Sequence, residues 1–143
     1  MAETIRTGRC LCGAVRYRHA GPLGAVVACH CEQCRRTSGH FVAGSPGHSA
    51  DLTIESSGAL RWYESSPEVY RGFCRECGSS LFWTDRPEQI TIMAGTLDQP
   101  TGLELTYQIY TAYAGDYYRI DPQLPSAPEA GDEMPEVPES GSD

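Results

Sequence analysis

Seven cysteines are the residues of this chain best suited to chemistry, and they form three short clusters. The clusters are Cys10-x-Cys12, Cys29-x-Cys31-x-x-Cys34 and Cys74-x-x-Cys77. Thiols that stand one or two residues apart cannot easily avoid one another, and these spacings are typical of metal ligands. Zinc is the ion we expect here, because it binds thiolates and completes a tetrahedron with four of them.

The spacing divides the seven thiols into a set of four and a set of three. Alternate residues of a strand point to the same face, so Cys10 and Cys12 can reach one ion from the end of a strand. Cys74 and Cys77 flank a two-residue turn that is followed by Gly78. Together these four thiols would make a closed Cys₄ site, which is the structural kind, and would tie the N-terminal strand to a distant part of the chain.

The second set, Cys29, Cys31 and Cys34, would place three sulfurs around one ion from a single strand-to-helix turn. A site with three protein ligands keeps its fourth position open for water or substrate, and this is the catalytic kind. His30 lies between two ligating cysteines on extended chain, so it points the opposite way and is expected to support the site rather than to bind the ion. His48, in a glycine-rich loop, is the other histidine considered for the open position.

Basic residues accompany both sets. Arg9 and Arg75 lie beside the four-cysteine set and are candidates to offset the charge of its thiolates. Arg35 and Arg36 follow Cys34 directly, and either can bind a carboxylate in a bidentate manner. The plain alternative for the second pair is a solvated surface.

Three other uses of the cysteines were weighed against zinc. Disulfides need an oxidising compartment, but residues 1–6 contain no apolar segment typical of a secretory signal, so reduced thiols and a cytoplasmic location are expected. Unliganded core cysteines would not show these spacings with flanking glycines and arginines. An iron–sulfur cluster held by three cysteines stays open as an alternative metal centre.

The elements that would position these residues are short strands. Segments with strand character, bounded by Gly, Pro, Ser or Asp, are 14–19, 25–28, 41–45, 52–55, 60–64, 69–74, 80–84, 89–94 and 105–110. The most helical stretch, residues 32–37, is two turns at most and is closed by Ser38-Gly39. The pattern predicts a mainly β protein built from antiparallel strands.

Charge separates the chain into a body and a tail. Residues 121–143 contain seven acids, five prolines and no base, whereas residues 1–120 contain 12 acids and 11 arginines. We expect one domain over residues 1–125 and an acidic, proline-rich, disordered tail over residues 126–143. The nearly neutral body argues against nucleic-acid binding, and no apolar run is long enough to cross a membrane.

The motifs as a whole resemble the glutathione-dependent formaldehyde-activating enzyme family, whose domain is shared with centromere protein V. The resemblance covers residues 7–125 and rests on four segments. They are Gly8-Arg9-Cys10-Leu11-Cys12-Gly13, Cys29-His30-Cys31-Glu32-Gln33-Cys34-Arg35-Arg36-Thr37-Ser38-Gly39, Phe73-Cys74-Arg75-Glu76-Cys77-Gly78-Ser79-Ser80-Leu81 and Gly95-Thr96-Leu97-Asp98. Two positions depart from the pattern: Gln108 stands where the family commonly has histidine, and Tyr117 where it has tryptophan.

The resemblance implies an Mss4-like arrangement of several antiparallel sheets with two zinc ions per chain. The structural ion would lie at Cys10, Cys12, Cys74 and Cys77, and the catalytic ion at Cys29, Cys31 and Cys34. The implied activity is that of a carbon–sulfur lyase that joins glutathione, or a similar thiol, to an aldehyde such as formaldehyde. The alternative is a non-enzymatic zinc module that binds a small thiol or a protein; monomer and homo-oligomer both remain open.

Overall fold

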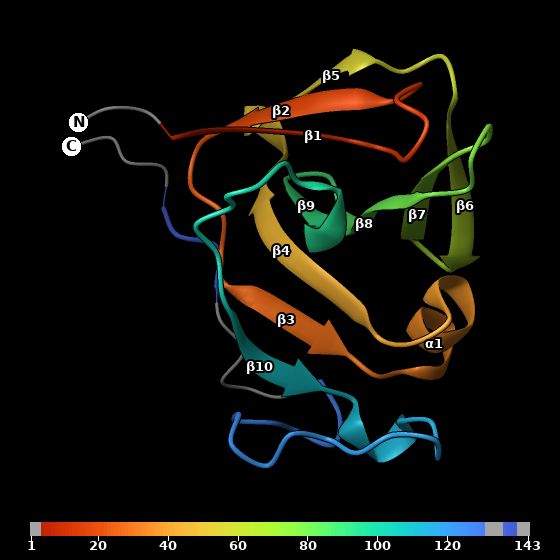
Figure 1. The fold of residues 1–143 in the computed structure, drawn as a ribbon, viewed down its shortest axis with the longest axis vertical. Coiled ribbons are helices and arrows are strands. Elements are labelled where there is room, and N and C mark those ends of the chain that lie inside the picture. The colour runs from red at the N-terminus through yellow and green to blue at the C-terminus, as the bar shows by residue number, and fades with distance from the viewer. Residues whose placement is uncertain (1–3, 131–135, 140–143) are drawn as a thin grey trace.

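A computed structural model describes residues 4–130 and 136–139 of the chain. Within these residues ten strands form two sheets, and one short α-helix, α1 (Glu32–Ser38), lies at an end of the larger sheet (Figure 1). Three single-turn 3₁₀ helices occupy Ser49–Asp51, Ala94–Thr96 and Thr111–Tyr113. The prediction of a mainly β protein with little helix is confirmed.

The smaller sheet has three antiparallel strands in the order β1-β2-β5. These strands are β1 (Ile5–Arg9), β2 (Arg16–Ala20) and β5 (Leu52–Ser56). Cys10 and Cys12 follow β1 directly, in the turn that leads back toward β2. Gly13 adopts a φ of 83° in this turn, a conformation that glycine reaches without steric cost.

The larger sheet has seven strands in the order β10-β3-β4-β9-β8-β7-β6. Their bounds are β3 (Val26–Cys29), β4 (Val42–His48), β6 (Leu60–Ser66), β7 (Val69–Cys74), β8 (Ser80–Arg86), β9 (Gln89–Met93) and β10 (Leu105–Ile109). Neighbours in this sheet are antiparallel except for β10 and β3, which run parallel. The parallel pair differs from the antiparallel expectation; it places Ile109 opposite Cys29, so the chain after β10 passes the three-cysteine turn.

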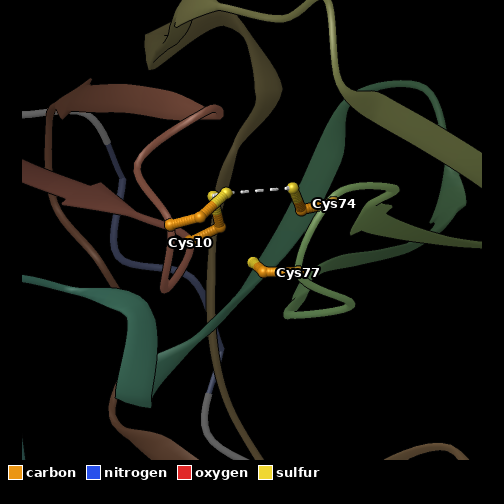
Figure 2. A group of neighbouring side chains, drawn as sticks. Cys10, Cys74 and Cys77 are labelled. Carbon is orange, nitrogen blue, oxygen red and sulfur yellow. Dashed lines mark hydrogen bonds between the residues drawn. The ribbon is translucent and has the colours of Figure 1, made fainter.

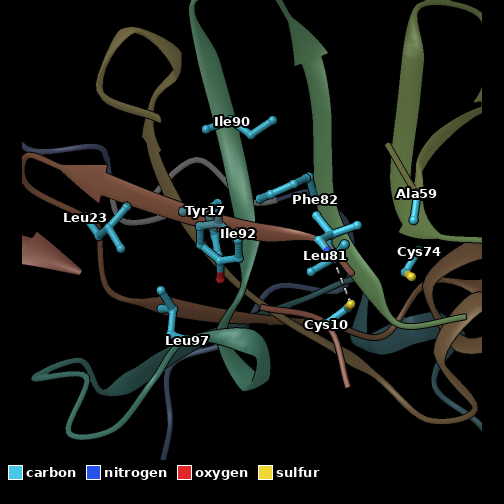
Figure 3. Packing of buried hydrophobic residues seen from close by; sticks show 11 residues of the cluster. Cys10, Tyr17, Leu23, Ala59, Cys74, Leu81, Phe82, Ile90, Ile92 and Leu97 are labelled. Carbon is cyan, nitrogen blue, oxygen red and sulfur yellow. Dashed lines mark hydrogen bonds between the residues drawn. The ribbon is translucent and has the colours of Figure 1, made fainter. Parts of the chain in front are cut away.

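The main hydrophobic core lies between the two sheets, where Tyr17 of β2 meets Phe82 of β8 and Ile92 of β9 (Figure 3). The Tyr17 and Phe82 rings form an edge contact with centroids 5.1 Å apart. The Tyr17 hydroxyl shares a 2.7 Å hydrogen bond with the Thr96 hydroxyl, and burial raises the pKa of Tyr17 to about 12. The backbone at Gly8 lies so close to Tyr17 that a Cβ atom at residue 8 would be 2.3 Å from the Tyr17 ring.

Nine of the strands begin and end within three residues of the predicted segments, and the helix begins at the predicted residue. The tenth, β1, was expected only as an N-terminal strand without bounds, because Ile5-Arg6-Thr7-Gly8-Arg9 carries only one large apolar residue. This strand is held by pairing with β2 rather than by a buried face of its own. Within the described residues, no helix is long and apolar enough to cross a membrane.

The start of the acidic segment lies against the edge of β10. Gln108 donates its backbone N–H to the Pro125 carbonyl and accepts from the Ala127 N–H, at 3.1 and 2.9 Å, and the Ala127 side chain is buried beside Val27 and Tyr107. Residues 126–129 therefore differ from the expectation of disorder beginning at Ser126. Residues 131–135 and 140–143 lie outside the described part, and the division of the chain at residue 125 stays a prediction.

Candidate metal centres

Two groups of sulfurs come together, and they are the groups that the spacing predicts. The ligand atoms within each group all lie within 4.8 Å of one another. One group contains Cys10, Cys12, Cys74 and Cys77, and the other contains Cys29, Cys31 and Cys34. All seven cysteines are free thiols. The assignment of metal-ligand and catalytic roles to these residues remains a prediction.

The four-cysteine group has sulfur separations that suit one tetrahedral ion. The Sγ atom of Cys12 lies 3.7 Å from that of Cys10 and 3.8 Å from that of Cys74. Four sulfurs that each stand about 2.3 Å from a zinc ion are about 3.8 Å apart at the corners of a tetrahedron, whereas disulfide sulfurs are about 2.0 Å apart. Figure 2 shows Cys74 and Cys77 on one turn facing Cys10 on the other. The donor set and its spacing therefore fit zinc.

Backbone and hydroxyl groups hydrogen-bond to these sulfurs and hold them in place. The Val15 N–H donates to Cys10 Sγ at 3.3 Å, and the Glu76 N–H donates to Cys74 Sγ at 3.4 Å. Ser79 Oγ lies 3.2 Å from Cys77 Sγ, and this contact is the largest cause that lowers the pKa of Cys77 to about 5. Cys10 and Cys74 also belong to the main core, so this group joins the core to two chain turns.

The three-cysteine group is built at the junction of β3 and α1. Cys29 ends the strand, Cys31 is the N-cap of the helix, and Cys34 lies buried in its first turn. Cys31 Sγ accepts the Cys34 N–H at 3.3 Å, so the sulfur takes the place of the usual hydroxyl or carboxylate cap. Gly39 ends the helix with a φ of 86° and donates its N–H to the Arg35 carbonyl.

The charges of the three thiols are tightly linked. Hydrogen bonds from Cys29 and then Cys34 lower the pKa of Cys31 to about 2, whereas the contact with Cys31 raises the pKa of Cys29. Ionisation of one of these thiols therefore disfavours ionisation of its neighbours. A cation among them is needed to let all three ionise together, which is the condition that thiolate coordination meets.

The His30 side chain lies in a buried polar network and does not join the three sulfurs, as the alternation of side chains along a strand predicts. Its side chain is buried; Nε2 donates to Gln108 Oε1 at 3.1 Å, and Nδ1 accepts from the Tyr118 hydroxyl. Gln108 Nε2 in turn donates to the Asp121 carbonyl at 3.0 Å. Gln108, which departs from the family pattern, thus completes a buried polar chain that fixes the His30 ring.

Within the described residues, none of the other side chains considered from sequence hydrogen-bonds to a sulfur. His48 ends β4 and its Nε2 lies 3.0 Å from the Pro138 carbonyl, and Arg36 pairs with Glu32 at 2.9 Å on the exposed side of α1. Arg9 donates to the Cys10 and Leu11 carbonyls rather than to a sulfur. Arg75 pairs with Glu76, and Arg35 keeps a buried Nε atom that has no hydrogen-bond partner within the described residues.

Two residues beside the three-cysteine group were missed from sequence. Both terminal nitrogens of Arg71, on β7, lie 3.7 Å from Cys34 Sγ. Tyr110, just after β10, has a left-handed backbone with a φ of 57°, and its pKa is raised by burial and then by the charges of the three cysteines. Neither position lies near Cys29, Cys31 or Cys34 in the sequence, so only strand order could have revealed them.

Comparisons with known proteins place the chain in a family. The family model described as glutathione-dependent formaldehyde-activating enzyme matches residues 5–113. A crystal structure of a Rhodobacter sphaeroides protein, a structural genomics target, is similar in fold, with a TM-score of 0.57 and 23% identity; the match covers 70% of this chain and 99% of that one. No curated protein matches significantly. Since the family model spans well over half of the sequence and both cysteine groups assemble as its motifs require, the chain belongs to the glutathione-dependent formaldehyde-activating enzyme family.

Proposed function

We propose that this protein is a zinc-dependent enzyme of the carbon–sulfur lyase type that joins a small thiol to an aldehyde such as formaldehyde. The observation that carries the proposal is the difference between the two sulfur groups. Four sulfurs complete the coordination of one ion, whereas three leave one position for a substrate atom. The proposed partners are a glutathione-like thiol and the aldehyde, in the reducing cytoplasm.

The reaction is an addition in which every atom is kept. A bond forms between the thiol sulfur and the carbonyl carbon, the π bond of the carbonyl breaks, and one proton moves from sulfur to oxygen. With formaldehyde the product is the S-hydroxymethyl adduct of the thiol, a hemithioacetal. Zinc, when bound, would act as a Lewis acid that favours the thiolate form of the substrate.

The chain itself supplies orientation and a proton donor. Cys29, Cys31 and Cys34 present their sulfurs from one rigid turn, whose rear is fixed by the buried contacts of His30. The His30 N–H donates to the Ile109 carbonyl at 3.0 Å, which places Tyr110 next to the three-cysteine turn, and burial and then the cysteine charges raise the pKa of its phenol. A protonated phenol can donate a hydrogen bond to the carbonyl oxygen as negative charge develops there.

The proposal is tested with the full-length, cobalt-loaded protein and two forms of the same tripeptide. Glutathione should increase the sulfur-to-cobalt charge-transfer absorption, and S-methylglutathione should not, because only the free thiol can become a further sulfur ligand. The Cys34→Ser variant is expected to lose the response, whereas the four-cysteine group keeps its cobalt. If both peptides act alike, or neither changes the spectrum, the proposed thiol chemistry is wrong.

A non-enzymatic zinc module is the second candidate, because a structural four-cysteine site is expected in either kind of protein. Catalytic turnover distinguishes the enzyme from the module. An enzyme must raise the rate of thiol–formaldehyde exchange above the uncatalysed rate, and Cys34→Ser must abolish the gain. A module binds without changing that rate.

A further inference from the structure

A cavity of about 280 Å³ adjoins the three-cysteine group. Its wall is formed by the end of α1 and by side chains of β4, β7, β8 and β9. Val42 and Met93 line the cavity and also pack against Cys34, so these two side chains lie between the cavity and the buried sulfur of Cys34. Phe73 and Phe82 contribute further apolar wall.

One charged side chain lines this space, and it is Arg71. Its guanidinium is held at two corners: Nε donates to Ser65 Oγ at 3.1 Å and Nη2 donates to Gln33 Oε1 at 3.2 Å. Nη1 lies 3.7 Å from Cys34 Sγ, and its contact with Thr37 Oγ1 is long, at 3.5 Å. Within the described residues no carboxylate pairs with Arg71, although four other arginines have such a partner.

A guanidinium in this setting has capacity for an anion. The 3.5 Å contact of Nη1 with Thr37 Oγ1 is longer than the 2.7–3.2 Å that N–H donors normally make to oxygen, so a carboxylate oxygen can replace it while the contact with Cys34 Sγ is kept. A flat carboxylate matches the planar fork of arginine, and two parallel N–H···O bonds to it are stronger than bonds to a neutral acceptor. The charge of Arg71 also favours the thiolate forms of Cys31 and Cys34.

We propose that Arg71 is a specificity-determining residue that binds a carboxylate of the thiol substrate within this cavity. The inference rests on the proposed function and narrows its substrate to thiols that carry a carboxylate. Because Arg71 touches Cys34 itself, a carboxylate on Nη1 would lie one side chain away from the sulfurs. Thiols that lack the anion would bind at the same sulfurs without this contact.

The test uses a matched pair of small thiols, 3-mercaptopropionate and its methyl ester, with the cobalt-loaded full chain. The charge-transfer absorption gives a dissociation constant for each thiol in the parent protein and in Arg71→Gln, Arg71→Lys and Arg61→Gln. Arg61 is the control, because its guanidinium donates only to the Gly58 and Leu60 carbonyls. Comparing the acid-to-ester ratio between proteins cancels the difference in acidity between the two thiols.

We expect Arg71→Gln to reduce the preference for the acid by about tenfold or more, the size of a charge-assisted hydrogen bond. The ester should bind nearly as before, Arg71→Lys should keep part of the preference because it keeps the charge, and Arg61→Gln should keep all of it. Equal weakening of acid and ester in Arg71→Gln would overturn the inference and leave Arg71 as a charge partner of Cys34 alone.

The carboxylate site can also be tested separately from the proposed function. If no thiol changes the cobalt spectrum, the carboxylate site is still measured through the Arg71 Nε–H resonance, assigned by its absence in Arg71→Lys. A shift of that resonance on adding S-methylglutathione, absent with its diethyl ester, would support the carboxylate site without thiol chemistry. No shift with either compound would overturn it.

Discussion

The sulfur atoms of Cys12 and Cys74 lie 3.8 Å apart although 62 residues separate them in the chain. The first belongs to the turn after β1 and the second ends β7, so the contact joins the smaller sheet to the larger one. Cys10 and Cys74 are at the same time members of the hydrophobic core between the sheets (Figure 3). An ion bound by the four-cysteine group would therefore join the two sheets at the hydrophobic core. The three-cysteine group, in contrast, lies within a single turn of the chain.

This difference predicts opposite results for two equivalent substitutions. Cys74→Ser should lower the free energy of unfolding by several kcal/mol, or give insoluble protein, because it removes a ligand from the site that joins the two sheets. Cys34→Ser should fold, with a small loss of stability and one zinc ion fewer per chain. Thermal unfolding and metal content measure both effects. Equal stability of the two variants would remove the distinction between a structural and an open site.

Much of this arrangement could be predicted from the sequence, because its signals are local. Alternation and turn residues located nine strands, and the i, i+2 and i, i+3 spacing of the cysteines defined both sulfur groups. Arg71 could not be found this way: its proximity to Cys34 depends on the order of β7 and α1 in space. The edge contact of Ala127 with β10 was missed for the same reason, since its polar surroundings in sequence conceal a backbone hydrogen-bond partner.

The pH dependence of stability should contain a contribution from His19. Its side chain is fully buried, Nε2 donates to the His48 carbonyl at 3.2 Å, and Nδ1 has no partner in the described structure. Burial lowers the pKa of His19 in the folded state. Between that pKa and the unfolded value of about 6.5, the unfolded chain binds more protons, so stability falls as pH falls, by at most about 1.4 kcal/mol per pH unit.

The measurement is chemical denaturation between pH 5 and pH 7.5 with excess zinc, for the parent protein, His19→Gln and His40→Gln. Release of zinc at low pH affects all three alike. His19→Gln should show a shallower loss of stability toward low pH, whereas His40→Gln, at an exposed site, should keep the parent slope. Identical slopes in all three proteins would show that His19 does not contribute.

Truncation should show where the domain ends. A chain ending at Leu124 loses the backbone bonds that Gln108, Tyr110 and Thr111 make to residues 125–129, together with the buried Ala127 side chain. Five backbone hydrogen bonds are lost, including the one from the Ala112 N–H to the Pro128 carbonyl, so we expect a decrease of about 3 kcal/mol in unfolding free energy. A chain ending at Ala130 should differ little from the full protein. If both truncated chains are as stable as the full chain, residues 125–129 do not contribute to the fold.

Tyr110 offers the sharpest test of how the chain itself takes part in the reaction. A left-handed backbone is uncommon for a tyrosine, and here it is held by the Tyr110 N–H, which donates to the Glu129 carbonyl at 2.9 Å. Such conformations cluster at functional sites, where the surroundings impose them. Tyr110→Phe keeps the ring and the backbone but removes the proton donor, so zinc content and thiol affinity should be unchanged while the exchange rate falls at least tenfold.

The exchange rate is measured by magnetisation transfer between ¹³C-formaldehyde hydrate and its thiol adduct, with the uncatalysed rate subtracted. Tyr113→Phe is the matched control: its ring lies 6.1 Å from that of Tyr110, but its hydroxyl donates to Glu129 Oε1 at an exposed position. It should retain the parent rate. If Tyr110→Phe also retains that rate while Cys34→Ser loses it, then the carbonyl oxygen receives its proton from water, and the contribution of Tyr110 is confined to packing beside β10.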